Sequence, residues 1–163
     1  MERAAAQEVA LRPNVIEQLI DVAPGSPVAE ATAARAALMQ ASQANYDAVL
    51  TPQDPGGLSQ PLRFALAARV ARLGGDAQLA AHYAAGGAVP EADASWQGAA
   101  MTAILRHVDL IATTPRDATA ADIAALQAVG MTTGDIVRLS QLIAFVSYQL
   151  RLIAGLRLMG ATP

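Results

Sequence analysis

Apolar residues at helical spacing run through the chain and predict helices. Between residues 59 and 73 they recur at i, i+4, i+8 and i+11, as on one helix face, at Leu62, Leu66, Val70 and Leu73. A second such face, on a helix expected to end before Pro115, comprises Met101, Ile104, Leu105, Val108 and Ile111. Alternation of the kind that marks strands never extends beyond a few residues. The pattern predicts an all-α protein.

Turn and capping residues set the limits of the first predicted helices. Asn14, with Glu17 three residues later, predicts the start of a short helix that the turn at residues 23–27 closes. A second helix is expected from Ser26-Pro27 to Thr51-Pro52, because proline suits the first turn of a helix. Residues 51–58, rich in proline and glycine, then form a loop.

Similar signals divide the rest of the chain. Ser59-Gln60-Pro61 opens the third helix, Gly74-Gly75 ends it, and a fourth is expected from Asp76 to about Ala85. Gly130 separates the last two helices. Each of these begins at a capping box, formed by Thr119 with Asp122 and by Thr132 with Asp135.

The final helix has the features of an interface helix. It presents two polar stripes on roughly opposite sides, one of Arg138, Gln141 and Gln149, the other of Ser140, Ser147 and Arg151. The apolar faces between them predict a helix held between its own core and a neighbouring subunit. Only twelve residues separate Arg138 from Arg151, whereas a membrane span needs roughly twenty. No membrane partner is expected.

Composition agrees with one helical domain that hides apolar surface in an oligomer. Hydrophobic residues make up 53% and charged residues 15% of the chain, against about 45–50% and about 25% in typical soluble domains. We expect a single domain over residues 1–163, with residues 1–25 as an N-terminal helical extension. The net charge of −3 and the dispersed arginines argue against a nucleic-acid partner.

The cysteine count excludes a whole group of mechanisms. The chain contains no cysteine, so it can form no disulfide, thiolate metal site or cysteine nucleophile. It has only two histidines and no HExxH-like spacing, so neither a metal site nor any other cofactor is expected. The N-terminal segment is charged and lacks the apolar core of a signal peptide, which predicts a cytoplasmic protein.

Residues 117–152 contain a distinctive motif made of Gln141, Leu142, Ile143, Ala144, Phe145, Tyr148 and Arg151. Through this motif the last third of the chain resembles the carboxymuconolactone decarboxylase and alkylhydroperoxidase D-like superfamily. Residues 57–75 resemble the helix that leads into the family's active-site motif. The resemblance implies the alkylhydroperoxidase D-like helical fold and a homo-oligomer (a trimer, hexamer or dimer) with a pocket near a subunit interface.

The family's redox residues are absent. Its peroxidases carry a glutamate in the leader helix, then a C-x-x-C pair that opens the next helix, then a histidine. By the resemblance, Phe64 stands at the glutamate position after Arg63, and Asp76 and Leu79 stand at the two cysteine positions. Tyr83 takes the histidine position, with His82 beside it; a one-residue shift aligns His82 but puts Gly75 and Gln78 at the cysteine sites. Neither register contains a thiol, so dithiol peroxide reduction by this chain alone is excluded.

The candidate catalytic residues are therefore His82 and Tyr83, since both can move a proton. Each also has a purely structural interpretation, His82 as a contact residue and Tyr83 as a packing residue. Asp76 is accounted for as a helix N-cap. Arg138 and Arg151 are candidates to bind a substrate carboxylate or to pair with acids.

Two functions follow from these residues. The first is a structural or regulatory family member that associates with a paralogue bearing C-x-x-C. The second is a cofactor-independent lyase or isomerase that acts on a small carboxylate through His82 and Tyr83.

Overall fold

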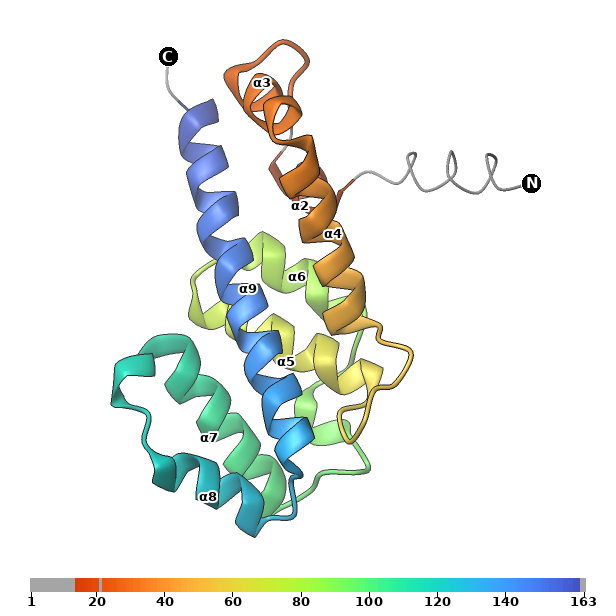
Figure 1. Cartoon of the computed structure of the whole chain (residues 1–163), viewed down its shortest axis with the longest axis vertical. Helices are drawn as coiled ribbons and strands as arrows, with labels where there is room; N and C mark the ends of the chain where they lie inside the picture. The colour runs from red at the N-terminus through yellow and green to blue at the C-terminus, as the bar shows by residue number, and fades with distance from the viewer. Residues whose placement is uncertain (1–13, 21, 162–163) are drawn as a thin grey trace, which may run out of the picture. The chain divides into compact units, whose positions relative to one another are not determined.

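All regular secondary structure is helical in the part that the computed structural model describes, residues 14–20 and 22–161 (Figure 1). The predicted all-α class is confirmed for these residues. The α-helices are α2 (Val15–Ile20), α3 (Pro27–Ala34), α4 (Ala36–Leu50), α5 (Gln60–Leu73), α6 (Ala77–Ala84), α7 (Ala99–Thr113), α8 (Ala120–Ala128) and α9 (Thr133–Gly160). Two short 3₁₀ turns, η1 (Pro90–Ala92) and η2 (Pro115–Asp117), precede and follow α7.

The chain divides into two compact units, one of residues 1–44 with 153–163 and one of residues 45–152. In the first unit, the Asn14 amide donates to the Met39 carbonyl at 2.5 Å, and Arg157 donates to the Leu19 carbonyl at 3.2 Å. The Asn14 side chain also accepts from Ile16 N–H at 2.9 Å, as its predicted capping role requires. The predicted single domain and extension stay predictions, because residues 1–13 and 21, including most of the charged N-terminal segment, lie outside the described residues.

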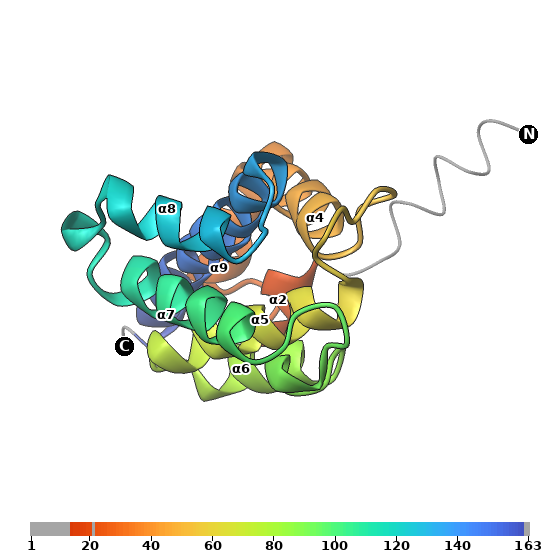
Figure 2. The same ribbon diagram turned by 90° about the horizontal axis from the view of Figure 1, so that it is seen from below.

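Helix α5 is the central element of the second unit. All seven of its residues from 62 to 68 are buried, so neighbours cover it on several sides. Helices α6 and α7 pack against it, and α8 packs against α7 (Figures 1 and 2). The part of α9 in this unit reaches both ends of α5: Leu150 lies against Gly74, and Asp135 binds Gly57 just before α5.

The predicted helix starts are confirmed by their caps. The side chains of Ser26, Ser59 and Asp76 each accept a hydrogen bond from the backbone N–H three residues later in the chain, at 3.1, 3.3 and 2.9 Å. The box of Thr119 with Asp122 is present in full. In the second box, Asp135 N–H donates to the Thr132 hydroxyl at 3.1 Å, which in turn donates to the Asp135 carboxylate at 2.6 Å.

Three sequence-based expectations were wrong in detail. The predicted second helix is broken at Arg35, whose backbone leaves helical geometry at φ −119°; the hydroxyl of Thr32 binds the Val28 carbonyl one turn earlier, an interaction that bends helices. Leu73 is 43% exposed, because α5 ends there and its last turn leaves the core. Gln149 is buried at 1% exposure, because Tyr83 provides a hydrogen-bonding partner inside the core.

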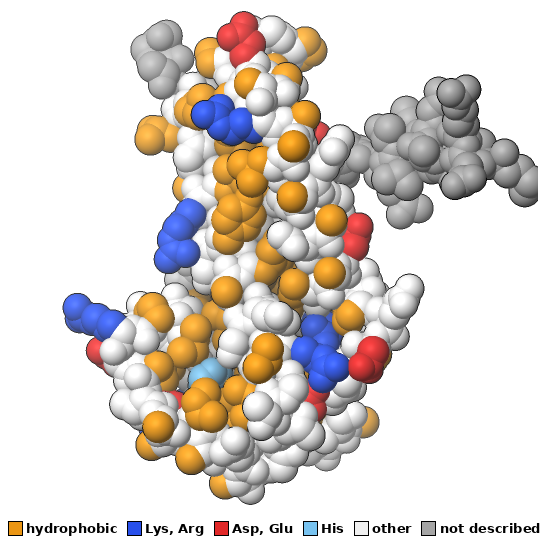
Figure 3. Space-filling model, in the orientation of Figure 1, with side chains coloured by type: hydrophobic (Ala, Val, Ile, Leu, Met, Phe, Trp, Pro, Cys, Tyr) orange, Lys and Arg blue, Asp and Glu red, His pale blue; other side chains and the backbone are white. Residues whose placement is uncertain are grey.

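Helix α9 is long and apolar enough to cross a membrane by length and composition alone, with a mean hydropathy of 1.4 in its most apolar window. Of that window, 39% is buried by the rest of the chain, and core helices pass the same test. Charged side chains are sparse on the face that Figure 3 shows, and apolar side chains lie between them. The absence of a membrane partner stays a prediction.

The close packing of α5 against the turn after α6 predicts a strong response at Gly87. A Cβ there would lie 2.3 Å from the Pro61 carbonyl oxygen, which is backbone and cannot rotate away. We expect Gly87→Ala to lower the free energy of unfolding by about 1–3 kcal/mol, because an overpacked site must shift. Gly155→Ala is the control: its Cβ meets nothing within 4 Å, so the substitution should stabilise α9 by about 0.5–1 kcal/mol. Urea denaturation measures both, and an equal response at the two positions would contradict this account.

Candidate functional site

Both candidate catalytic residues lie on α6 and join an aromatic cluster. The cluster is held by ring contacts with centroids 5.4–6.5 Å apart and comprises Tyr46, Phe64, His82, Tyr83 and Phe145. His82 is half-buried, and its Nε2 lies 3.0 Å from the Tyr46 hydroxyl. Tyr83 is fully buried, stacks on Tyr46 and donates its hydroxyl proton to Gln149. The structure thus places His82 where it can exchange a proton and locks Tyr83 in the core.

Burial determines the protonation states in the cluster. It lowers the pKa of His82 below its usual value of 6.5, so the imidazole is neutral at neutral pH. Burial, with a contribution from Asp47, raises the pKa of Tyr46 to about 12. Burial likewise raises the pKa of Tyr83 well above its ordinary value, so both phenols keep their protons. The Tyr46–His82 pair is therefore a neutral hydrogen bond, and the tautomer of His82 decides which group donates.

The remaining motif positions hold residues with structural roles. Asp76 caps α6 by accepting from Leu79 N–H. The Leu79 side chain is fully buried, and Phe64, 8% exposed, packs edge-on against Tyr46. Phe64 also fills the space beside Gly86, where an added Cβ would lie 2.4 Å from its ring. Each position therefore contributes to packing or capping.

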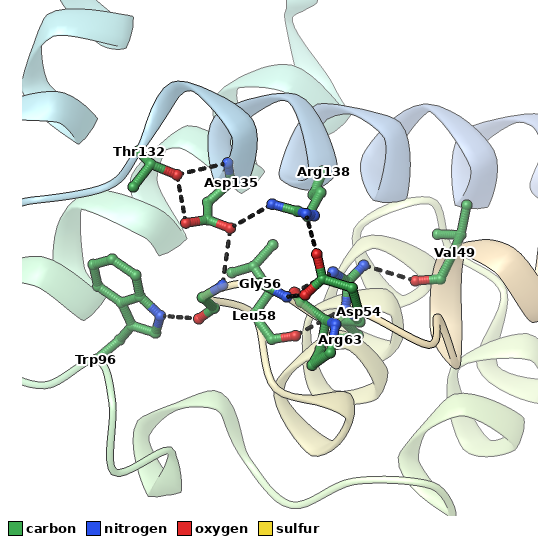
Figure 4. Close-up of polar contacts among 11 residues, drawn as sticks. Val49, Asp54, Gly56, Leu58, Arg63, Trp96, Thr132, Asp135 and Arg138 are labelled. Atoms are coloured by element: carbon green, nitrogen blue, oxygen red, sulfur yellow. Dashed lines mark hydrogen bonds and ion pairs between the residues drawn. The ribbon is translucent and has the colours of Figure 1, made fainter.

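A buried arginine, Arg63, organises the second polar region of this unit. It is 2% exposed, and its guanidinium donates to three backbone carbonyls in loop 51–58 and the end of α4 (Figure 4). The acceptors are the carbonyls of Leu58 at 2.9 Å, Val49 at 2.8 Å and Pro55 at 2.7 Å. Burial lowers the pKa of Arg63, but arginine stays charged at neutral pH. Arg63 ties the loop to the start of α5.

Asp135 connects the same loop to α9. Its carboxylate accepts from Gly57 N–H at 2.9 Å and from Arg138 at 3.1 Å, besides the Thr132 hydroxyl (Figure 4). Burial alone would raise the pKa of Asp135, but these donors lower it below the usual range. The Gly57 carbonyl in turn accepts from the Trp96 indole at 2.5 Å, so one residue joins α9 to the segment before α7.

The two arginines proposed to bind a carboxylate lie in different settings. Arg138 pairs with Asp135 and, at 3.0 Å, with Asp54, so its charge is matched within the chain. Arg151 is exposed and donates to the Ser147 carbonyl at 3.1 Å. Within residues 14–20 and 22–161, no hydrogen bond or ion pair joins either arginine to His82 or Tyr83. The structure does not bring the four candidates into one site.

Two cavities lie near η1, away from the candidate residues. One of about 160 Å³ is lined by Ser59, Pro61, Leu62, Asp93 and the alanine-rich segment around η1. The other, of about 500 Å³ and more open, is lined by Glu91 and by residues at the start of α7. Neither is lined by His82 or Tyr83. The described residues contain no group of three or more histidine and acidic side chains that could hold a metal ion.

Sequence reasoning missed three residues that shape these regions: Arg63, Tyr46 and Gln149. Arg63 stands among apolar residues in a helix that is apolar on more than one side, and that pattern signals burial of a charged side chain. Tyr46 and Gln149 meet α6 from 36 and 66 residues away in sequence. Local spacing cannot reveal such pairs.

The three carbonyls bound by Arg63 predict its importance for stability. We expect Arg63→Met to lower the free energy of unfolding by more than about 3 kcal/mol, because part-buried carbonyls would lose their donors. Arg72→Met, an exposed position in the same helix, should change it by less than about 1 kcal/mol. Chemical denaturation measures the free energy of unfolding of both variants. If both lose the same amount, the hydrogen bonds of Arg63 do not give the stabilisation expected here.

Comparisons with known proteins do not assign a family or a function to this chain. No family model, curated protein or solved structure matches the chain. A family and a function for the protein therefore rest on its own residues.

Proposed function

We propose that this chain is a cysteine-less member of the carboxymuconolactone decarboxylase and alkylhydroperoxidase D-like superfamily. In this proposal it has that superfamily's helical fold, no dithiol peroxidase activity of its own, and a structural or regulatory role beside a C-x-x-C-bearing relative. It acts in the cytoplasm, without nucleic acid or membrane as partner.

The observation that carries the proposal is the state of the motif positions. The residues there are buried or capping: Asp76 holds the start of α6, and Leu79, Phe64 and Tyr83 fill the core around it. A reactive thiolate would need an accessible, polar setting at the helix start. The motif region therefore supports a scaffold role, in which the helix arrangement is kept and the chemistry belongs to another chain.

An exposed stripe on α9 supports association with another chain. It follows one helix face at i, i+4, i+7, i+11 and i+14 and comprises the exposed Val137, Gln141, Ala144 and Arg151 together with the half-buried Tyr148. Val137 is 51% exposed, and Ala144 leaves room for close approach of a second helix. This α9 stripe is the surface that we assign to contacts in a homo-oligomer or with the relative.

Co-expression with a C-x-x-C-bearing relative encoded beside its gene tests the proposal. We expect the two chains to co-elute in size-exclusion chromatography with light scattering, and peroxide to be consumed only when the relative is present. Ala144→Glu should weaken co-elution, because it places a charge in the α9 stripe. Ala125→Glu, on an exposed position of α8, should not. A stable homo-oligomer that ignores the relative would refute the hetero-association, and a lone monomer would refute both forms of assembly.

One observation favours a second function, a cofactor-independent lyase or isomerase acting on a small carboxylate. His82 is half-buried, neutral and 3.0 Å from the Tyr46 hydroxyl, which suits a group that moves a proton. This alternative assigns acid-base chemistry to His82 and Tyr83 and carboxylate binding to Arg138 or Arg151. Because Tyr83 is fully buried, His82 is the acid-base residue that we test, with Tyr46 as the group that orients it.

Benzoate, a simple carboxylate probe, tests this alternative. We expect added benzoate to shift the ring resonances of His82 saturably in nuclear magnetic resonance spectra, and to leave those of His107 unchanged. The shift should weaken in Arg151→Gln if that arginine receives the carboxylate. Absence of any saturable shift at His82 would remove the enzyme interpretation and leave the scaffold proposal untouched.

A further inference from the structure

The second histidine, His107, is buried, and its ring has no hydrogen-bonding partner within the described part of the chain. It lies on the inner face of α7 and is 4% exposed, and neither Nδ1 nor Nε2 has a hydrogen-bonding partner among the described residues. A neutral imidazole has one N–H donor and one nitrogen acceptor, and both are unsatisfied here. Buried polar atoms in this state destabilise the closed structure and are rare in proteins. Neither proposed function accounts for the burial of this imidazole.

Helix α8, which packs on α7, is weakly anchored. Of its nine residues only Leu126 is buried, and Ile123 is 37% exposed. The 3₁₀ turn η2 before it has no buried residue. Elements that bury few apolar side chains open at low free energy. Figures 1 and 2 show α8 beside α7, joined to it through η2.

The charges around His107 favour its protonation once water can reach it. Asp122 on α8 attracts the imidazolium, and its own pKa is lowered by hydrogen bonds from Thr119, so it stays ionised in mild acid. Two other pairs of charged groups lie on or beside α7. On the α5 side, Arg69 binds Asp109 at 2.6 Å, and on η2 Arg116 and Asp117 lie 3.6 Å apart. Arg106, next to His107, belongs to neither pair, and its charge acts on Asp122.

We propose that His107 makes α8 an acid-sensitive flap, which opens from α7 when the ring takes up a proton. The closed form excludes water from the ring and offers it no acceptor, so it disfavours the charged imidazolium. The open form lets water hydrate the imidazolium, whereas in the closed form only the charge of Asp122 partly offsets the cost of burial. This device is independent of the scaffold and enzyme proposals.

The direction of the pH effect follows from proton binding. Burial lowers the pKa of His107 in the closed form below its usual value of 6.5, although Asp122 partly opposes this. At pH values between 6.5 and the lowered pKa of the closed form, the open form binds up to one more proton than the closed form. Closure of α8 is therefore fully favoured above 6.5 and is weakened as the pH falls below it. In that window the opening equilibrium constant rises by up to about tenfold per pH unit.

Native-state hydrogen exchange measured from about pH 7.5 to about pH 5 tests the proposal. After correction for intrinsic exchange rates, protection of the α8 amides should fall as the pH drops through the window, by up to about tenfold per unit. In His107→Leu the protection should be higher and independent of pH. The chain has only two histidines, so His82→Gln is a matched control that should keep the pH dependence.

Three results would overturn the proposal. The first is α8 protection that does not depend on pH in the unaltered chain, and the second is pH dependence that persists in His107→Leu. The third is a ring titration of His107, followed by nuclear magnetic resonance in the unaltered chain, with a pKa at or above 6.5. This titration needs no substitution, so it decides the matter even if His107→Leu does not fold.

Discussion

The hydrogen bonds that the Arg63 guanidinium donates are the interactions on which the packing of the second unit depends. One planar, charged group donates to three backbone carbonyls from the end of α4 and from loop 51–58, and so fixes the loop against the start of α5. With the loop held, Gly57 presents its N–H to Asp135 and its carbonyl to Trp96. Helix α9 and the segment before α7 are therefore positioned through a loop that Arg63 orders.

A buried arginine is acceptable here because its charge is spread over several acceptors. Burial and the charge of Arg138 disfavour the ion, but three carbonyl dipoles accept hydrogen bonds from it, and Asp135 and Asp54 favour the charged form. Asp135 is itself stabilised by three donors, so acid and base in this region support one another through the loop backbone. The polar network thus performs a task that an apolar contact could not, namely ordering a proline- and glycine-rich loop with few side chains of its own to bury.

The candidate site could be predicted from the sequence only in part. The Gly74-Gly75 break followed by Asp76 predicted a capped short helix from Asp76 to about Ala85, and the family resemblance singled out His82 and Tyr83 on it. Their roles depended on partners elsewhere: Gln149 binds Tyr83, and Tyr46 lies beside His82. These contacts turn one candidate into a core residue and leave the other able to exchange a proton. Spacing along α6 contains no information about either partner.

The sequence by itself determined the helical class and nearly all helix limits, because capping side chains, prolines and glycines act on the backbone within three or four residues. Two features could not be predicted from local sequence. The helix breaks at Arg35 although no proline or glycine stands there, and the exposure of Leu73 depends on where α5 leaves the core. Only the tertiary structure decided which partners the buried Arg63 and His107 meet: Arg63 donates to three backbone carbonyls, whereas neither ring nitrogen of His107 has a hydrogen-bonding partner among the described residues. Burial and hydrogen bonding depend on which distant segments meet, and that is a property of the packed chain.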